Sequence, residues 1–167
     1  MKFETSLDKL TKVITVISTI LFAVVIVGFL SNNTLSNEPS VLIAISILPI
    51  TYIGVLLFRP ISYSLSAHKL TVIRPLKNIE FKLKEIEKVE LLDNAMLKGT
   101  IRTFGVGGLF GYWGKFYNRK IGTMTWYATR WSNAVLITTK SNSKIVLTPD
   151  QPDIFIAELT KTITETK

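Results

Sequence analysis

The side chains that could carry catalysis in this sequence are few and scattered. His68 is the single histidine, and the chain contains no cysteine. The main acidic cluster runs from Glu80 to Asp93, but lysines interleave with it, as on a solvated strand face of mixed charge. No metal-ligand spacing and no Ser/His/Asp set can be assembled from these residues. We therefore predict that the protein is not an enzyme and holds no metal and no cofactor.

The segment most suggestive of binding is Arg102 to Lys120, where five glycines interleave with aromatic residues and three cations follow. Aromatic rings favour headgroup depth, and each Lys or Arg near an anionic surface contributes about 1 kcal/mol. The pattern predicts a contact with the membrane surface or a partner through Arg102, Phe110, Tyr112, Trp113, Lys115, Arg119 and Lys120. The alternative is that the glycines permit tight strand bends while the aromatic rings fill a β core.

Small residues line one face of the first apolar segment. Thr15, Thr19 and Ala23 are four residues apart, so they share one side of a helix. Such a face lets a second helix approach closely. We expect the second apolar segment to be that helix, and self-association through the same face is the alternative.

Two apolar segments, Val13 to Leu30 and Val41 to Phe58, precede the binding candidates. Neither carries a charge, whereas all 20 Lys and Arg residues lie outside them. At about 1.5 Å per residue each forms a helix of roughly 27 Å, which with its flanks matches a hydrocarbon core of about 30 Å. We predict two transmembrane helices. The alternatives are a cleaved signal peptide for the first, a buried hairpin of a soluble protein for both, and a re-entrant second segment interrupted by Pro49 and Gly54.

The distribution of Lys and Arg around these segments predicts their orientation. The connection, Ser31 to Ser40, has no Lys or Arg, whereas Lys9 and Lys12 precede the first segment and Arg59 follows the second. Such a bias places the cation-rich flanks in the cytoplasm. We expect a multi-pass protein of the cell (inner) membrane with both termini cytoplasmic. Residues 1–58 would form the anchor and residues 59–167 a cytoplasmic domain.

The chain from Arg59 onward changes to the period-two pattern of half-buried strands and holds 17 of the 20 Lys and Arg residues. Its turns contain Ser and Asn, as between neighbouring strands. The expected strands are Ile61 to Leu65, Lys69 to Arg74, Ile79 to Lys84, Ile86 to Leu92, Thr123 to Arg130, Ala134 to Thr139 and Lys144 to Leu147. Seven or so short antiparallel strands suggest a barrel or a sandwich.

The end of the chain predicts an amphipathic helix that packs on the β core. Thr148 suits the N-cap and Pro149 the first helical position, and a start at Asp150 is the alternative. Apolar residues then recur at helical intervals, at Phe155, Leu159 and Ile163.

About seven strands followed by one helix resembles the pleckstrin-homology (PH) fold, and the details are similar to small bacterial membrane proteins with a PH-like domain. The motifs that carry the resemblance are the strands Tyr63 to Leu65 and Lys69 to Val72, the Gly-rich Gly107 to Gly114, and the Thr-Pro-Asp-x-Pro-x-x-Phe helix start at Thr148 to Phe155. It covers Arg59 to Lys161. It implies an α+β protein, a two-helix transmembrane hairpin followed by an antiparallel β-barrel of about seven strands and a C-terminal α-helix. It speaks to fold more than to function, because PH-like folds bind lipids, peptides and proteins alike.

Two ligand classes are not supported. Phosphoinositide-binding PH domains carry a row of cations across the first hairpin, and here that region offers only Lys69 and Arg74. The sequence pI of about 9.7 could indicate nucleic-acid binding. However, an anionic cytoplasmic leaflet explains the same charge without that partner.

Three functions remain. The first is a membrane-anchored interaction module whose partners are the lipid bilayer and a protein or a second copy of itself. The second is an accessory subunit of a larger membrane complex, such as a transporter or secretion machine, with the spans as its interface. The third is an enzyme acting on lipids, for which Glu85, Glu87, Glu90 and His68 are the last candidates.

Overall fold

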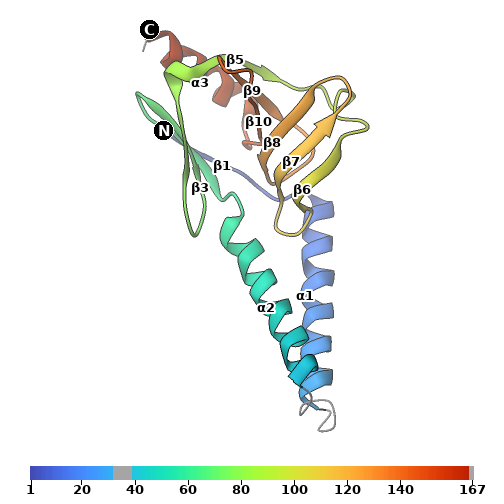
Figure 1. The fold of residues 1–167 in the computed structure, drawn as a ribbon. Coiled ribbons are helices and arrows are strands. Elements are labelled where there is room, and N and C mark those ends of the chain that lie inside the picture. The colour runs from blue at the N-terminus through green and yellow to red at the C-terminus, as the bar shows by residue number, and fades with distance from the viewer. Residues whose placement is uncertain (32–38, 166–167) are drawn as a thin grey trace.

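A computed structural model describes residues 1–31 and 39–165 of the chain. Two long helices, α1 (Lys9–Leu30) and α2 (Pro39–Phe58), carry a β domain at one end (Figure 1). The C-terminal helix α3 (Pro152–Glu165) packs at the side of that domain away from the two long helices. The predicted α+β class is confirmed.

Helix α1 begins where the sequence supplies a cap. The Asp8 carboxylate accepts the Thr11 backbone N–H at 2.7 Å, which satisfies one of the free donors of the first turn. Over Lys9–Phe29, α1 is the one helix in the described residues that is long and apolar enough to cross a membrane. The corresponding stretch of α2, Ser46–Phe58, is shorter. Most of the expected outer connection, residues 32–38, lies outside the described residues.

The strands form two sheets rather than one. The first sheet is antiparallel, in the order β1-β2-β3-β4. Its strands are β1 (Lys2–Glu4), β2 (Ser62–Leu65), β3 (Lys69–Ile73) and β4 (Ile79–Lys82). The second sheet has the order β5-β9-β10-β8-β7-β6. Its strands are β5 (Ile86–Leu91), β6 (Ile101–Gly107), β7 (Tyr112–Asn118), β8 (Gly122–Ala128), β9 (Val135–Thr139) and β10 (Lys144–Leu147).

The expected antiparallel barrel is therefore wrong in two respects. The sheets do not close on each other, because a 3-10 turn, η2 (Leu83–Glu85), separates β4 from β5 and these strands join different sheets. The second sheet is also mixed, since β10 pairs parallel with β8 and antiparallel with β9. One free edge of that sheet is β6, whose register shifts between Arg102 and Phe104. Such irregularities are common where strand pairing ends.

Two apolar clusters hold the domain together, one on each face of the second sheet. The first joins both sheets to α3 and includes Tyr63, Phe155 and Leu159. The second lies on the opposite face and includes Trp126 and Phe116. Strand β10 is buried on both faces, with Val146 in the second cluster and its neighbours in the first.

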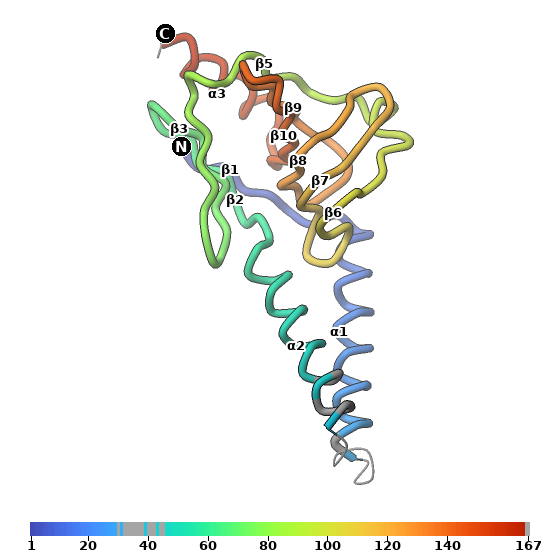
Figure 2. The backbone as a smooth tube through the Cα atoms, in the orientation of Figure 1, coloured from blue at the N-terminus to red at the C-terminus, as the bar shows by residue number. Residues whose placement is uncertain are grey.

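Strand β1 was not predicted, because three residues are too short to show a period. It pairs with β2 so that Phe3 lies opposite Tyr63, and the Phe3 ring contacts Phe155 edge to face at 5.0 Å. The chain then runs along the domain to α1 (Figure 2). The segment before α1 is thus part of the β domain's core.

Helix α3 begins later than either predicted start, at Pro152. The expected capping residues have other partners. The Thr148 hydroxyl accepts the Thr129 N–H at 2.9 Å, and the Asp150 carboxylate accepts hydrogen bonds from Ser6 and Arg130. Tertiary contacts therefore override the local capping signal.

Candidate interaction surface at the helix–domain junction

The turn between β6 and β7 lies between the domain ends of α1 and α2 (Figure 1). We call Gly108 to Gly111 the tip. At its centre Phe110 is only 8% exposed, and its backbone N–H donates to the Thr15 hydroxyl of α1 at 3.0 Å. Its ring contacts the Tyr52 ring of α2 edge to face at 5.2 Å. The tip therefore contacts both long helices at once.

The tip can fit there because its backbone turns through conformations that glycine permits. Gly108 and Gly111 have φ of +118° and +130°, and the Gly108 N–H donates to the Gly111 carbonyl at 2.8 Å. A Cβ on Gly111 would lie 2.7 Å from the Ala128 carbonyl oxygen. Phe110 itself has φ of +56°, which is uncommon for an aromatic residue. Burial against two helices offsets that backbone strain.

A series of rings continues from the tip down between the helices. The Arg59 guanidinium lies 5.6 Å from the centre of the Phe110 ring, and Tyr52 contacts Phe110 on one side and Phe22 at 5.4 Å on the other. The Tyr52 hydroxyl also lies 2.7 Å from the Thr19 hydroxyl, which donates to the Thr15 carbonyl. Both predicted threonines of the α1 face are thus engaged by the tip or by α2.

A second contact joins α2 to the β domain. The Phe58 ring lies 5.9 Å from the Trp113 ring, and the Arg74 guanidinium sits 5.4 Å from Phe58 and 5.9 Å from Tyr127. Desolvation by burial lowers the pKa of Arg74 and raises that of Tyr127. The guanidinium thus lies between two rings, as in a cation–π contact.

The N-terminal segment fixes α1 to the same domain. The Asp8 carboxylate that caps α1 also accepts the Trp131 N–H at 3.2 Å. Asp150 accepts two hydrogen bonds from Ser6 and lies 2.6 Å from the Arg130 guanidinium. Burial would raise the pKa of Asp150, but the Ser6 hydrogen bonds and the Arg130 charge outweigh it and hold the pKa below its usual value.

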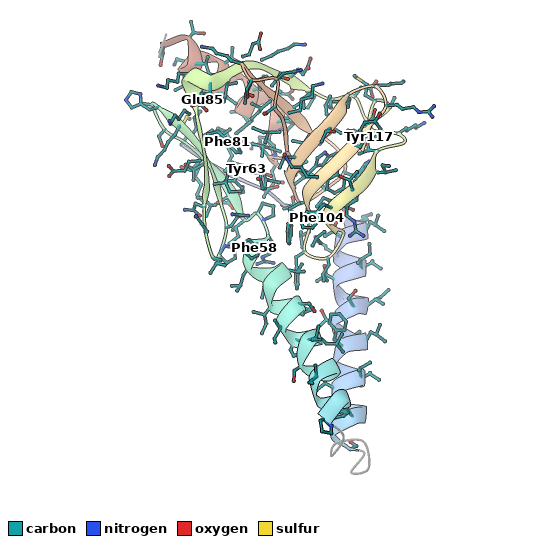
Figure 3. The ribbon with its side chains drawn as sticks, viewed as in Figure 1. Phe58, Tyr63, Phe81, Glu85, Phe104 and Tyr117 are labelled. Atoms are coloured by element: carbon teal, nitrogen blue, oxygen red, sulfur yellow. The ribbon has the colours of Figure 1, made fainter. Side chains whose placement is uncertain are left out.

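One face of the β6–β7 pair remains exposed. We call Ile101, Phe104, Lys115 and Tyr117 the outer face, because the register places Ile101 opposite Tyr117 and Phe104 opposite Lys115. Ile101 is 58% exposed, Phe104 75% and Tyr117 41%. Figure 3 shows Phe104 toward the long helices and Tyr117 farther from them. Adjacent exposed apolar side chains mark an interaction surface more often than isolated ones do.

The stretch of chain that contains the outer face carries charge of one sign. Residues 94–149 contain eight Lys and Arg residues and no Asp or Glu. Among the described residues, all the salt bridges involve other side chains. No ion pair within this part of the chain is therefore made by Arg102, Lys115, Arg119 or Lys120. A partner of this face would therefore supply negative charge.

The structure divides the predicted contact residues into two groups. Phe110 and Tyr112 are buried, with Tyr112 4% exposed in the second cluster beside Trp126, and Trp113 is half-buried against Phe58 of α2. The cations Arg102, Lys115, Arg119 and Lys120 are exposed. Arg119 and Lys120 follow the end of β7 opposite the tip. The predicted segment thus combines a helix contact, part of the core and an exposed cationic surface.

Ala23 is the third residue of the predicted helix face. It lines a groove between α1 and α2 together with Thr19 and Tyr52. Sequence reasoning missed Ile101, Phe104 and Tyr117 as surface residues, since only the register shows which aromatic side chains point outward. It also missed Asp8, although an Asp directly before an apolar helix is a recognisable cap signal.

No group of three or more His, Asp or Glu residues that could hold a metal occurs within residues 1–31 and 39–165. His68 lies exposed in the turn between β2 and β3, where its carbonyl accepts the Leu83 N–H at 3.0 Å. The absence of enzymatic activity remains a prediction.

Two sheets and a C-terminal helix beside two apolar helices agree with a PH-like domain, a class that generally mediates protein or lipid interactions and is generally non-catalytic. The family model described as Bacterial PH domain matches residues 61–163. This match covers more than half of the chain, so the protein belongs to the bacterial PH domain family. The predicted resemblance is confirmed. Comparisons with curated proteins and with solved structures gave no match.

Proposed function

We propose that this protein is a membrane-anchored interaction module, in which two spanning helices hold a PH-like domain at the cytoplasmic face of the cell membrane. The outer face of β6–β7 then binds an acidic segment of a partner protein. The observation that carries the proposal is the exposed apolar outer face within a stretch of chain that has cations and no carboxylates. Anionic groups are attracted to such a surface and steered to it.

The proposed anchor consists of α1 and α2, with residues 59–167 as the cytoplasmic domain completed by β1. The 20 residues of α2 carry no charge, and a helix of this length matches the hydrocarbon core. The tip contacts both helices at their domain ends, which supports a pair of spans rather than one span and a soluble helix. The cation bias of the flanks supports the orientation with both termini inside.

The geometry favours a protein partner over the membrane surface. Strand β7 has seven residues, which extend roughly 20 Å from the tip at about 3.4 Å per residue. The headgroup layer on each side of a bilayer is only roughly 6 Å thick. Strands β6, β7 and β8 slant away from the long helices (Figure 1). In the proposed arrangement Arg119 and Lys120, which follow the far end of β7, therefore lie beyond the lipid surface. Only the Phe104 end of the outer face lies near the membrane.

The topology can be tested with single cysteines, because the chain has none of its own. Ser31→Cys should react with an impermeant maleimide in intact cells, and Thr164→Cys only after the membrane is permeabilised. Reaction of both, or of neither, in intact cells would contradict the proposed orientation.

The partner can be tested with the full chain in its membrane. A photo-crosslinking amino acid at Ile101 should capture a protein, and the double change Arg102→Gln with Phe104→Ser should abolish that capture. The matched control is a crosslinker at Ile154, which is 52% exposed on α3 and should capture nothing comparable. Capture of lipid alone at Ile101 would favour the membrane surface. Crosslinks at both positions to the same large complex would favour an accessory subunit instead.

A further inference from the structure

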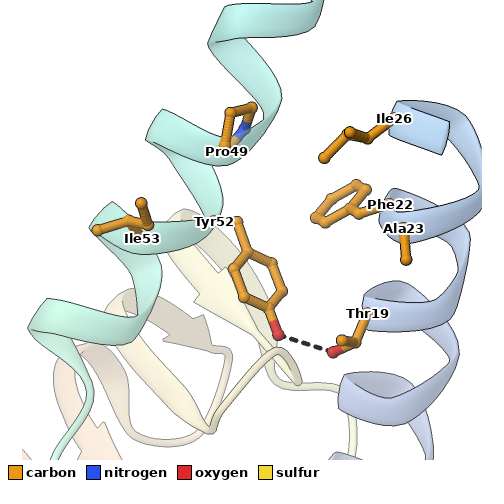
Figure 4. A pocket seen from close by; sticks show the side chains of 7 residues that line it. All are labelled: Thr19, Phe22, Ala23, Ile26, Pro49, Tyr52 and Ile53. Atoms are coloured by element: carbon orange, nitrogen blue, oxygen red, sulfur yellow. Dashed lines mark hydrogen bonds between the residues drawn. The ribbon is translucent and has the colours of Figure 1, made fainter. Parts of the chain in front are cut away.

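An apolar groove of about 210 Å³ lies between α1 and α2 below the tip. It is lined by Thr19, Phe22, Ala23, Ile26, Pro49, Tyr52 and Ile53 (Figure 4). Its two polar side-chain atoms, the Thr19 and Tyr52 hydroxyl oxygens, lie 2.7 Å apart and form a hydrogen bond with each other. An apolar cavity of about 150 Å³ already takes up benzene. The groove therefore has room for part of a hydrocarbon chain.

The tip and the small side chain of Ala23 on the α1 side both contribute to the shape of the groove. Phe110 contacts Tyr52 and Thr15, so it separates the helices at their domain ends. Ala23 fills little of the space that remains beneath. In the proposed bilayer arrangement, this space is at the depth of the lipid chains.

Positive charge lies at the domain end of the groove. The Arg59 guanidinium lies over the Phe110 ring, and that ring contacts Tyr52 of the groove lining. Arg59 has no carboxylate partner among the described residues. Lys12 precedes Thr19 by seven residues, so it lies on the same side of α1. Both cations are placed where lipid headgroups begin.

We propose that the groove binds one acyl chain of an anionic phospholipid, whose headgroup is held by Arg59 together with Lys12. This rests on the two-span arrangement of the proposed function. A second copy of the chain fits less well, because a symmetric contact would bring two sets of Arg59 and Lys12 together.

The test uses the full chain, extracted in mild detergent and exchanged into micelles containing phosphatidylglycerol or phosphatidylcholine. Native mass spectrometry should show one retained phosphatidylglycerol per chain. Ala23→Phe fills the groove and should lower retention at least fivefold. Arg59→Gln should leave the acyl chain bound but remove most of the preference for phosphatidylglycerol over phosphatidylcholine. The matched control is Val24→Phe, since Val24 is 63% exposed and does not line the groove, and it should retain lipid like the natural chain.

Equal lipid retention in the Ala23→Phe and Val24→Phe chains would overturn the proposal. So would an Ala23→Phe change that turns a dimer into a monomer while lipid retention is unchanged, because the groove would then be a contact between copies. Should Ala23→Phe fail to fold, Ala23→Leu fills less of the groove and should lower lipid retention by a smaller factor. Crosslinking at Ile101 and the cysteine labelling are measured on the same chains. Loss of lipid binding is thus distinguishable from loss of the anchor or of the partner.

Discussion

The tip and the outer face belong to the same β-hairpin, yet they have opposite surroundings. The tip is buried between two helices, whereas the outer face, a few residues along the same strands, exposes Phe104 to 75%. Both contain aromatic residues and adjoin glycines. Their surroundings differ because the tip lies between the two long helices, whereas the strands slant away from these helices. Aromatic content alone therefore does not distinguish a structural contact from a binding surface.

The same difference separates stability from binding. Changes at the tip act on two helices and the domain together, so they should alter the free energy of unfolding. Changes at the outer face remove few intramolecular contacts, so they should alter partner capture and leave stability nearly unchanged.

The largest effect is expected for Phe110→Ala. Truncation of a buried Phe costs about 3–5 kcal/mol, and here it also removes the ring between Arg59 and Tyr52. A large fall in melting temperature is expected for the purified chain in detergent, measured by intrinsic fluorescence. Phe104→Ala is the matched control and should change the stability by less than about 0.5 kcal/mol. If the two changes proved equally destabilising, the division between tip and outer face would be wrong.

A somewhat smaller effect is expected for Gly114→Ala. Gly114 and Gly105 face each other in the β6–β7 pair with φ of +119° and +108°, and a Cβ on Gly114 would collide with the Phe104 carbonyl. A side chain in such a backbone conformation costs about 1–3 kcal/mol. The same melting measurement should show this loss. Gly107→Ala provides the comparison, because its Cβ would meet only the flexible Arg102 side chain at 3.4 Å, and it should be nearly neutral.

Asp8→Ala should cost about 1–2 kcal/mol, since it removes the cap of α1 and leaves the Trp131 N–H without its partner. Asp8→Asn keeps an acceptor for the cap and should lose less. Thermal unfolding of both variants in detergent checks this order. An Asp8→Asn chain as unstable as the Ala chain would show that charge rather than capping is decisive.

The smallest effect is a dependence on acid pH. Asp150 has a lowered pKa in the folded chain, so its contribution to stability is complete above the unfolded value of about 3.9. It is lost as the pH falls through the lower folded value. Melting temperatures of the natural chain and of Asp150→Asn, measured between pH 6 and pH 3, should therefore converge toward the acid end. A difference that stays constant over this range would remove the electrostatic explanation.

Most of the domain's strands could be predicted from alternation. Lys144 to Leu147 was predicted with the bounds that β10 has, and β3 differs from its predicted range only by Arg74. Strands β6 and β7 were missed because their glycines and aromatic residues hide the period. The parallel pairing of β8 with β10 was missed because no local signal gives the order of strands in a sheet.

The candidate site was only partly predictable. The Arg102 to Lys120 segment was identified by composition, but its division into buried tip and exposed outer face depends on long-range contacts such as Phe110 with Thr15. The start of α3 was predicted too early for the same reason. Thr148 and Asp150 have good capping chemistry, but residues far away in sequence use it.

Strand β1 has a consequence for the order of assembly. Phe3 reaches its place opposite Tyr63 only after the chain has passed through α1 and α2 and begun the domain. Pairing across so long a separation in sequence is slow, because the entropy of closing the intervening loop is lost first. During synthesis the N-terminal strand therefore stays unpaired until both long helices have emerged. The β domain is therefore completed only after both long helices have been synthesised.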